Sequence, residues 1–139
     1  MFIRNLSSQR FWKIVARTIL GVVFVLGGIA HFTASETELK LIPPFLPLRR
    51  EALYITGVFE SLGGLGLFAP SAKVRRTSAW GLVALLVIIF PANVYQAVAN
   101  IQLGGFMSTR AYQWGRLPFQ AVFILWALWC TSDNTVEKK

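Results

Sequence analysis

The sequence is poor in the residues that carry redox and metal chemistry. It holds one cysteine, Cys130, and one histidine, His31. A single cysteine excludes an intrachain disulfide and a C-x-x-C redox pair, so we interpret Cys130 as a small packing residue. Transition-metal sites need about three or four good ligands, and His31 with Glu60 supplies too few. We therefore expect no bound metal.

Acidic residues are also scarce. Six Asp and Glu stand against fourteen Lys and Arg, which gives a formal net charge of +8. The basic residues flank apolar runs and form no stripe interleaved with aromatic side chains. They therefore favour charges that set membrane topology over a nucleic-acid partner. The sequence also lacks a phosphate-binding glycine loop, a nucleophile elbow and a metalloprotease helix, which leaves open whether the protein is an enzyme.

Apolar residues dominate the chain. With 55% hydrophobic residues, 14% charged residues and a mean hydropathy of +0.55, too few polar side chains remain to cover a soluble globule. Four apolar segments can cross a hydrocarbon core of about 30 Å as helices, and none alternates as a barrel strand would. We predict an all-α fold in one membrane domain over residues 1–139, a polytopic protein that forms an antiparallel up-down-up-down four-helix transmembrane bundle. The expected helices cover residues 12–33, 51–69, 77–99 and 113–131.

The basic residues also orient the expected bundle. Lys and Arg number four in the N-terminal segment, three in the second loop and two at the C-terminus, against three and two in the other loops. The positive-inside rule then places both termini in the cytoplasm. The first apolar segment could also be a signal peptide, but no suitable pair of small residues stands around Ala34, so we expect a retained helix.

Polar residues interrupt every expected span. They are His31, Glu60, Asn93, Arg116 and Gln120. An ionisable side chain in hydrocarbon costs about 2.5 to 3.5 kcal/mol, so it persists only where something compensates for it or uses it. With the termini inside, all of them fall in the outer half, which suggests a cavity open to the outside. We expect apolar residues such as Val22, Leu65, Leu85 and Leu125 to close it beneath.

Glu60 lies on a stripe of small residues. Gly57, Glu60, Ser61 and Gly64 stand at helical spacing, which indicates that another helix approaches this face closely. Glu60 could face a ligand or handle protons. It could equally form an ion pair with Arg116, or stay protonated and hydrogen-bonded in the core, and Arg116 alone could reach the outer interface instead.

Two amides and two tyrosines complete the candidate ligand-binding set. Asn93 and Gln120 suit interhelical hydrogen bonds as well as ligand contacts. Pro91 removes a backbone donor just before Asn93 and indicates a loosened helix at a cavity wall. Most aromatic residues fall near the expected membrane interfaces. Tyr54 and Tyr95 instead lie nearer the polar cluster, so we include them as candidates.

The first loop is apolar and rich in proline. Residues 39–48 read LKLIPPFLPL, and the three prolines forbid a long regular helix. Its apolar side chains are poorly placed in water. The segment could fold over the mouth of the bundle as a lid, or rest on lipid headgroups as an irregular linker.

Phrases along the chain resemble a known family. They are GGIAHF around His31, IPPFLP in the first loop, YITGVFESLGGLGLFAP around Glu60, AWGL from Ala79, FPANVYQA around Asn93 and RLPFQAVFILWALW from Arg116. In this order and spacing, over residues 14–131, they resemble the DoxX-like family of small four-helix membrane proteins. The resemblance implies a four-helix bundle, which we expect in a bacterial inner membrane. For some members it implies membrane subunits of oxidoreductase systems that handle thiosulfate, quinone or thiol stress.

The resemblance also shapes the functional hypothesis. It implies that His31, Glu60, Asn93, Arg116 and Gln120 are functional positions, because they match the polar positions of the family phrases. The missing cysteine pair is a departure from the family and puts autonomous thiol chemistry in doubt. The chain is also distantly similar to EXPERA-type sterol-binding bundles, whose acidic residues face a lipophilic pocket. We expect binding of a lipophilic small molecule, with a quinone as the candidate cofactor. Membrane lipids and a membrane or periplasmic redox subunit are the expected partners. The alternatives are a lipid or amphiphilic-cation binding or transport protein, and a non-catalytic structural subunit.

Overall fold

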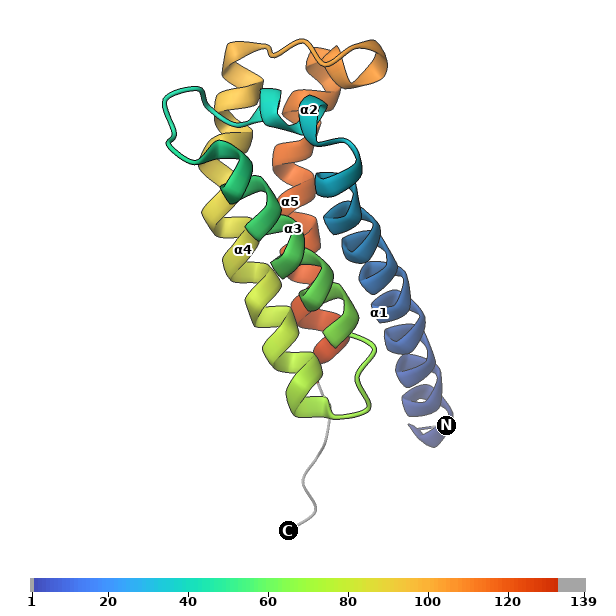
Figure 1. Cartoon of the computed structure of the whole chain (residues 1–139). Coiled ribbons are helices and arrows are strands. Elements are labelled where there is room, and N and C mark those ends of the chain that lie inside the picture. The colour runs from blue at the N-terminus through green and yellow to red at the C-terminus, as the bar shows by residue number, and fades with distance from the viewer. Residues whose placement is uncertain (1, 133–139) are drawn as a thin grey trace.

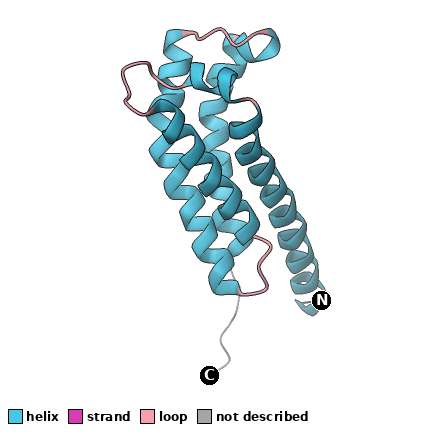
Figure 2. Cartoon of the chain, viewed as in Figure 1, coloured by secondary structure: helices cyan, strands magenta, loops and turns pink. Residues whose placement is uncertain are grey.

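A computed structural model describes residues 2–132, with the backbone alone at residues 2–7 and 35. Within that range the chain is helical and forms no strand (Figure 2). The long helices are α1 (Phe2–Thr33), α3 (Arg49–Gly66), α4 (Ala72–Ala99) and α5 (Arg110–Thr131). The short elements are α2 (Ser35–Glu38) and the 3-10 turns η1 (Leu39–Leu41) and η2 (Gly105–Ser108). The predicted all-α class is confirmed.

The long helices lie side by side and alternate in direction (Figure 1). The most extensive packing joins α1 to α3 and α4 to α5, whereas the seam between α1 and α5 is the least extensive contact between neighbouring long helices. One end of the bundle carries α2, η1 and η2, and we call it the loop end (Figure 1). The opposite end carries the start of α1 and the turn between α3 and α4.

The helix boundaries differ from the predicted ones for local reasons. α4 and α5 begin earlier than predicted because the hydroxyl groups of Ser71 and Thr109 each accept a hydrogen bond from the N–H three residues on, at 3.5 and 3.2 Å. α1 begins at Phe2 because no proline or glycine interrupts its first turns. α3 ends earlier than predicted, at Gly66, where the chain turns toward Pro70.

Glycines bring α1 and α3 into close contact. A Cβ atom on Gly57 would lie 2.9 Å from the carbonyl oxygen of Gly28, and one on Gly64 would lie 2.8 Å from that of Gly21. Real Cβ atoms do not approach other atoms so closely, so only glycine allows the two backbones to lie at this separation. The helix that approaches the small-residue stripe of Glu60 is therefore α1.

The apolar core differs from the expected one. Its fully buried large side chains are Leu20, Leu67 and Leu82. Val22, Leu65 and Leu125, which we expected to fill the inner half, are 45%, 54% and 68% exposed, and Leu85 is half-buried. The sequence places these residues at the right depth, but the rotation of each helix turns them outward. That part of the prediction is wrong.

The outer surface of the bundle is strongly apolar. Leu26, Phe59, Ile88 and Leu125, one from each long helix, are 60 to 73% exposed. Two of the described helices, α1 over Ser8–Thr33 and α4 over Ala72–Ala99, are long and apolar enough to cross a membrane by length and composition. The buried share of the apolar window is 22% in α1 and 28% in α4.

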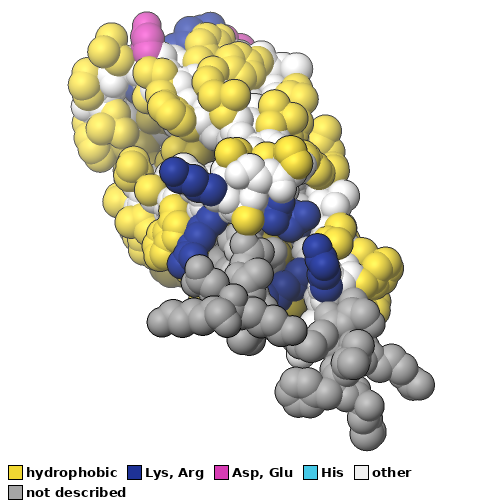
Figure 3. Space-filling model, turned by 90° about the horizontal axis from the view of Figure 1, so that it is seen from below, with side chains coloured by type: hydrophobic (Ala, Val, Ile, Leu, Met, Phe, Trp, Pro, Cys, Tyr) yellow, Lys and Arg dark blue, Asp and Glu magenta, His cyan; other side chains and the backbone are white. Residues whose placement is uncertain are grey.

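Basic side chains gather at the end opposite the loop end (Figure 3). α1 contributes Lys13 and Arg17, and the start of α4 contributes Lys73, Arg75 and Arg76. We call this the basic end. The two ends of the bundle therefore differ in charge as well as in loop structure.

Candidate functional site

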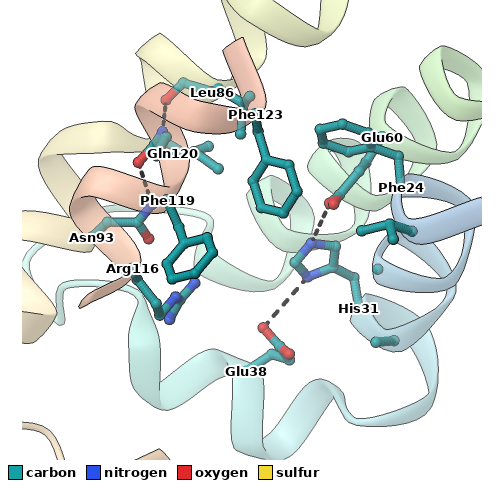
Figure 4. A pocket seen from close by; sticks show the side chains of 14 residues that line it. Phe24, His31, Glu38, Glu60, Leu86, Asn93, Arg116, Phe119, Gln120 and Phe123 are labelled. Atoms are coloured by element: carbon teal, nitrogen blue, oxygen red, sulfur yellow. Dashed lines mark hydrogen bonds and ion pairs between the residues drawn. The ribbon is translucent and has the colours of Figure 1, made fainter. Parts of the chain in front are cut away.

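A cavity of about 260 Å³ lies in the loop-end half of the bundle (Figure 4). Its polar lining consists of His31, Glu38, Glu60, Asn93, Arg116 and Gln120. Its aromatic lining consists of Phe24, Phe119 and Phe123. Because α1 and α5 supply most of the lining, the cavity follows the seam between these two helices.

His31 lies between two carboxylates. Its Nε2 atom is 2.9 Å from Oε2 of Glu60, and its Nδ1 atom is 3.6 Å from Oε2 of Glu38 (Figure 4). The second distance is too long for a hydrogen bond, so Nδ1 is buried without a hydrogen-bond partner. The side chains of His31 and Glu60 are both 17% exposed, so this pair is largely withdrawn from solvent. An imidazole between two carboxylates is suited to holding and passing a proton.

The same geometry bears on metal binding. Glu38 and Glu60 approach opposite nitrogens of the His31 ring, so the three side chains do not converge on one point. Across residues 2–132, no three His, Cys, Asp or Glu side chains form a group that could hold a metal ion. Cys130 is buried at the far end of α5, away from this cavity.

Arg116 is tied to α4 and to the first loop. Its Nη1 atom donates a hydrogen bond to Oε1 of Gln96 at 2.8 Å, and its guanidinium lies 5.7 Å from the ring centroid of Tyr112. Gln96 is 6% exposed and donates in turn to the carbonyl oxygen of Leu41 at 3.0 Å. A guanidinium carries five N–H donors, so Arg116 can bind Gln96 and a ligand at the same time.

The proline-rich segment lies on the loop end of the bundle (Figure 1). Arg49 donates hydrogen bonds to the carbonyl oxygens of Leu39 and Ile42, and Gln96 holds Leu41. Phe45 meets the ring of Tyr95 edge-on, with centroids 5.9 Å apart. These contacts hold the segment against the starts and ends of the neighbouring helices.

A third polar group joins α4 and α5. Nδ2 of Asn93 donates to Oε1 of Gln120 at 2.9 Å, and Nε2 of Gln120 donates to the carbonyl oxygen of Leu86 (Figure 4). Gln120 is 4% exposed, and both of its side-chain polar atoms have hydrogen-bond partners inside the protein, as buried polar groups usually do. Pro91 lies in this part of α4, and the Gln120 amide bonds a carbonyl one turn before it.

The structure brings five of the seven candidate residues together. His31, Glu60, Asn93, Arg116 and Gln120 all line the one cavity. The two tyrosines do not line it. Tyr54 stacks on Phe32 with centroids 5.3 Å apart, and Tyr95 lies against Phe45.

One interpretation of the sequence paired Glu60 with Arg116, but these two residues have other partners in the structure. Glu60 pairs with His31, and Arg116 hydrogen-bonds Gln96, so the described structure does not contain a Glu60–Arg116 ion pair. The physical reason is the rotation of α3. Its glycine stripe packs on α1, which places Glu60 beside His31. Arg116 on α5 instead faces Gln96 on α4.

Two polar residues of the site were missed in the sequence. Glu38 belongs to the short helix α2 beyond the first predicted span, and only its contact with His31 shows its place. Gln96 follows Asn93 by three residues, so helical spacing does place both on one face of α4. That spacing is the signal that could have identified Gln96.

A surface groove meets the cavity. It has a volume of about 470 Å³ and is lined by Phe106, Ala111, Tyr112 and Gly115, together with three residues that also line the cavity. Those shared residues are Arg116, Phe119 and Phe123. Phe119 is 62% exposed, so this junction lies at the surface of the bundle. The polar cavity therefore adjoins an apolar surface beside α5.

Comparison with known proteins identifies a family. No curated protein and no solved structure matches this chain significantly. The sequence model of one family, described as a domain of unknown function (DUF8561), matches residues 20–131. The matched segment includes every residue that lines the cavity. The chain belongs to the DUF8561 family.

Proposed function

We propose that this protein is an integral membrane protein whose four long helices all cross the bilayer. The apolar windows of α1 and α4 are mostly exposed, unlike the core helices of soluble proteins. α3 and α5 lie beside them and also expose large apolar side chains, including Phe59 and Leu125. Contact between this apolar surface and lipid costs little free energy, whereas contact with water is unfavourable.

The charge distribution favours one orientation. The basic end fits the cytoplasmic face by the positive-inside rule, which puts both termini in the cytoplasm and the cavity in the outer half. Together with the sequence phrases, this arrangement supports a DoxX-like protein of the bacterial inner membrane.

The cavity binds the head group of a lipophilic small molecule, and a quinone fits its chemistry best. The observation that carries this proposal is the lining: the guanidinium of Arg116, which has N–H donors beyond the one that binds Gln96, shares one small cavity with three aromatic rings. A quinone offers carbonyl oxygens to such donors and a flat ring to the aromatic wall. The cavity is below the usual range of about 300 to 1,000 Å³ for ligand sites, so it suits a head group rather than a whole lipophile.

The charges disfavour the amphiphilic cation that was the other candidate ligand. A cation would need a carboxylate as counter-ion, but Glu60 already contacts His31 at 2.9 Å and Glu38 lies 3.6 Å from the other nitrogen of the same ring. A guanidinium in the same cavity would also repel it. A neutral carbonyl compound meets neither obstacle.

The adjoining groove supports a lipophilic ligand. Because Arg116, Phe119 and Phe123 line both spaces, a head group in the cavity can continue into an apolar portion along α5. The ligand would then reach its site from the lipid side, through the seam between α1 and α5.

Within a membrane oxidoreductase system, the chain would bind the quinone and handle its protons. His31 and Glu60 lie where they could pass a proton to a bound head group. A membrane or periplasmic redox subunit would supply the electrons. The protein's own part is binding, orientation and proton transfer.

Native mass spectrometry of protein extracted in mild detergent tests this proposal. We expect a co-purifying quinone, identified by extraction and chromatography. Retention of another lipid or an amphiphilic cation in place of quinone would contradict it and support the binding or transport alternative. A protein that retains no small molecule and stays bound to a second subunit would contradict it in favour of a structural role.

A further inference from the structure

Two apolar grooves lie side by side in the basic-end half of the seam between α1 and α5. One has a volume of about 490 Å³ and extends from Gln9 to Ile19 on α1. The other has a volume of about 420 Å³ and extends over Val122 and Leu125 on α5. Ala16, Trp126 and Trp129 line both grooves, so the two grooves adjoin. None of these residues lines the polar cavity, so this is a separate site.

A cationic group lies beside the wall that the two grooves share. Nζ of Lys13 is 5.9 Å from the ring centroid of Trp129, the wall residue that the grooves share. The same Nζ donates to the carbonyl oxygen and the hydroxyl group of Ser132 at 2.6 and 2.9 Å. Both acceptors are neutral, and no carboxylate within residues 8–132 forms an ion pair with Lys13.

The grooves cover part of the depth of one membrane leaflet. From Lys13 to Ile19 the helix rises about 9 Å, and from Trp129 to Val122 about 10 Å, against about 15 Å for half of a hydrocarbon core. Both grooves extend from the basic end toward the middle of the bundle. An acyl chain that starts beside Lys13 would therefore follow either groove for the first part of its leaflet.

We propose that these grooves bind the two acyl chains of one anionic phospholipid, with its head group against Lys13. The inference rests on the membrane placement proposed above but not on the quinone. Paired apolar grooves match two chains, and the ammonium group beside their shared wall residue Trp129 matches a phosphate. A second copy of this chain fits less well, because a two-fold contact here would bring two basic ends together.

Lipid titration of the purified full chain, followed by native mass spectrometry, tests the site. The probes are dioleoyl phosphatidylglycerol, dioleoyl phosphatidylcholine and the one-chain lysophosphatidylglycerol. We expect phosphatidylglycerol to bind about fivefold more tightly than phosphatidylcholine, and Lys13→Gln to remove that preference. We expect the one-chain lipid to bind several-fold more weakly than its two-chain counterpart.

Groove-filling variants locate the acyl chains. Val122 is 50% exposed in the second groove, and Val87 is 58% exposed on α4 outside both grooves. Val122→Trp should reduce phosphatidylglycerol binding to the level of the one-chain lipid, whereas Val87→Trp should not change it. Equal binding of all three lipids, an unchanged preference in Lys13→Gln, or a dimer in place of bound lipid would overturn the proposal. A chain found in the soluble fraction of cells would instead refute the membrane placement itself.

Discussion

His31 and Glu60 meet at 2.9 Å, between two helices, α1 and α3, that glycines bring into close contact. The contact joins two helices and also forms one side of the cavity. Its removal should therefore change stability and the site together. Glu60→Ala should lower the free energy of unfolding by about 1 to 2 kcal/mol, because it leaves the His31 Nε2 atom without a partner.

Unfolding in detergent, followed by tryptophan fluorescence, measures this effect. Glu60→Gln keeps a hydrogen-bonding group and should lose less than half as much. Glu51, exposed in the first turn of the same helix, is the matched control, and Glu51→Ala should change stability little. Equal losses in Glu60→Ala and Glu51→Ala would contradict a structural role for the pair.

The glycine contact between α1 and α3 should tolerate no side chain. Gly57→Ala puts a Cβ atom 2.9 Å from the Gly28 carbonyl oxygen, so the helices must separate, at a cost of about 1 to 3 kcal/mol. Gly81 on α4 has open space around it, and Gly81→Ala should be neutral or stabilising by up to about 1 kcal/mol. The melting temperatures of the two variants provide the comparison, and a Gly57→Ala variant as stable as the original would show that the helices are not this close.

The contact of Gln96 with Leu41 should hold the proline-rich segment in place. Gln96→Leu removes the hydrogen bond to the Leu41 carbonyl, so the segment should open more often. We expect the amides of Ile42 and Leu46, which are hydrogen-bonded within the segment, to exchange about tenfold faster.

Hydrogen exchange with mass spectrometry measures that change. Gln102, exposed in the loop after α4, bonds only its own loop, so Gln102→Leu is the control and should leave these amides unchanged. Unchanged exchange in Gln96→Leu would mean that Arg49 and the Phe45–Tyr95 contact hold the segment without Gln96.

The groove beside α5 should matter only for ligands with an apolar tail. Gly115 lines this groove and has open space around it, so Gly115→Leu should fill the groove without disturbing the helix. We expect binding of decylubiquinone to weaken about tenfold, and binding of ubiquinone-0, which has no tail, to stay the same.

Gly81→Leu, an equivalent change on the surface of α4, is the control for that experiment and should affect neither ligand. Fluorescence quenching titrations in nanodiscs give the affinities. Unchanged decylubiquinone binding in Gly115→Leu would place the tail elsewhere.

The sequence contained most of the information about helix position and depth. Apolar runs located the long helices, and depth alone gathered His31, Glu60, Asn93, Arg116 and Gln120 in one half of the bundle. The capped starts of α4 and α5 were also present in the sequence as Ser71 and Thr109, but the prediction did not use them.

Helix rotation was much harder to predict. Glu60 lies on a glycine stripe, but the sequence does not say which helix packs on that stripe, so His31 and Arg116 were both plausible partners. For the same reason, the sequence did not show that Val22 and Leu125 face outward. Glu38 could not be found at all, because the short helix α2 gains its place only through the folded loop end.

Arg116 is the residue that we propose to bind the head group of a quinone in the cavity. The most direct measurement is the dissociation constant of ubiquinone-0 for the original protein, Arg116→Gln and Arg110→Gln. Arg110 is exposed at the start of the same helix and does not line the cavity, so it controls for charge. We predict that Arg116→Gln weakens binding about 10- to 100-fold and that Arg110→Gln leaves it within about twofold, since only the first loses a charged donor to the ligand. Equal affinities in all three proteins would show that Arg116 does not bind the head group, and no saturable binding in any would show that the cavity is not a quinone site.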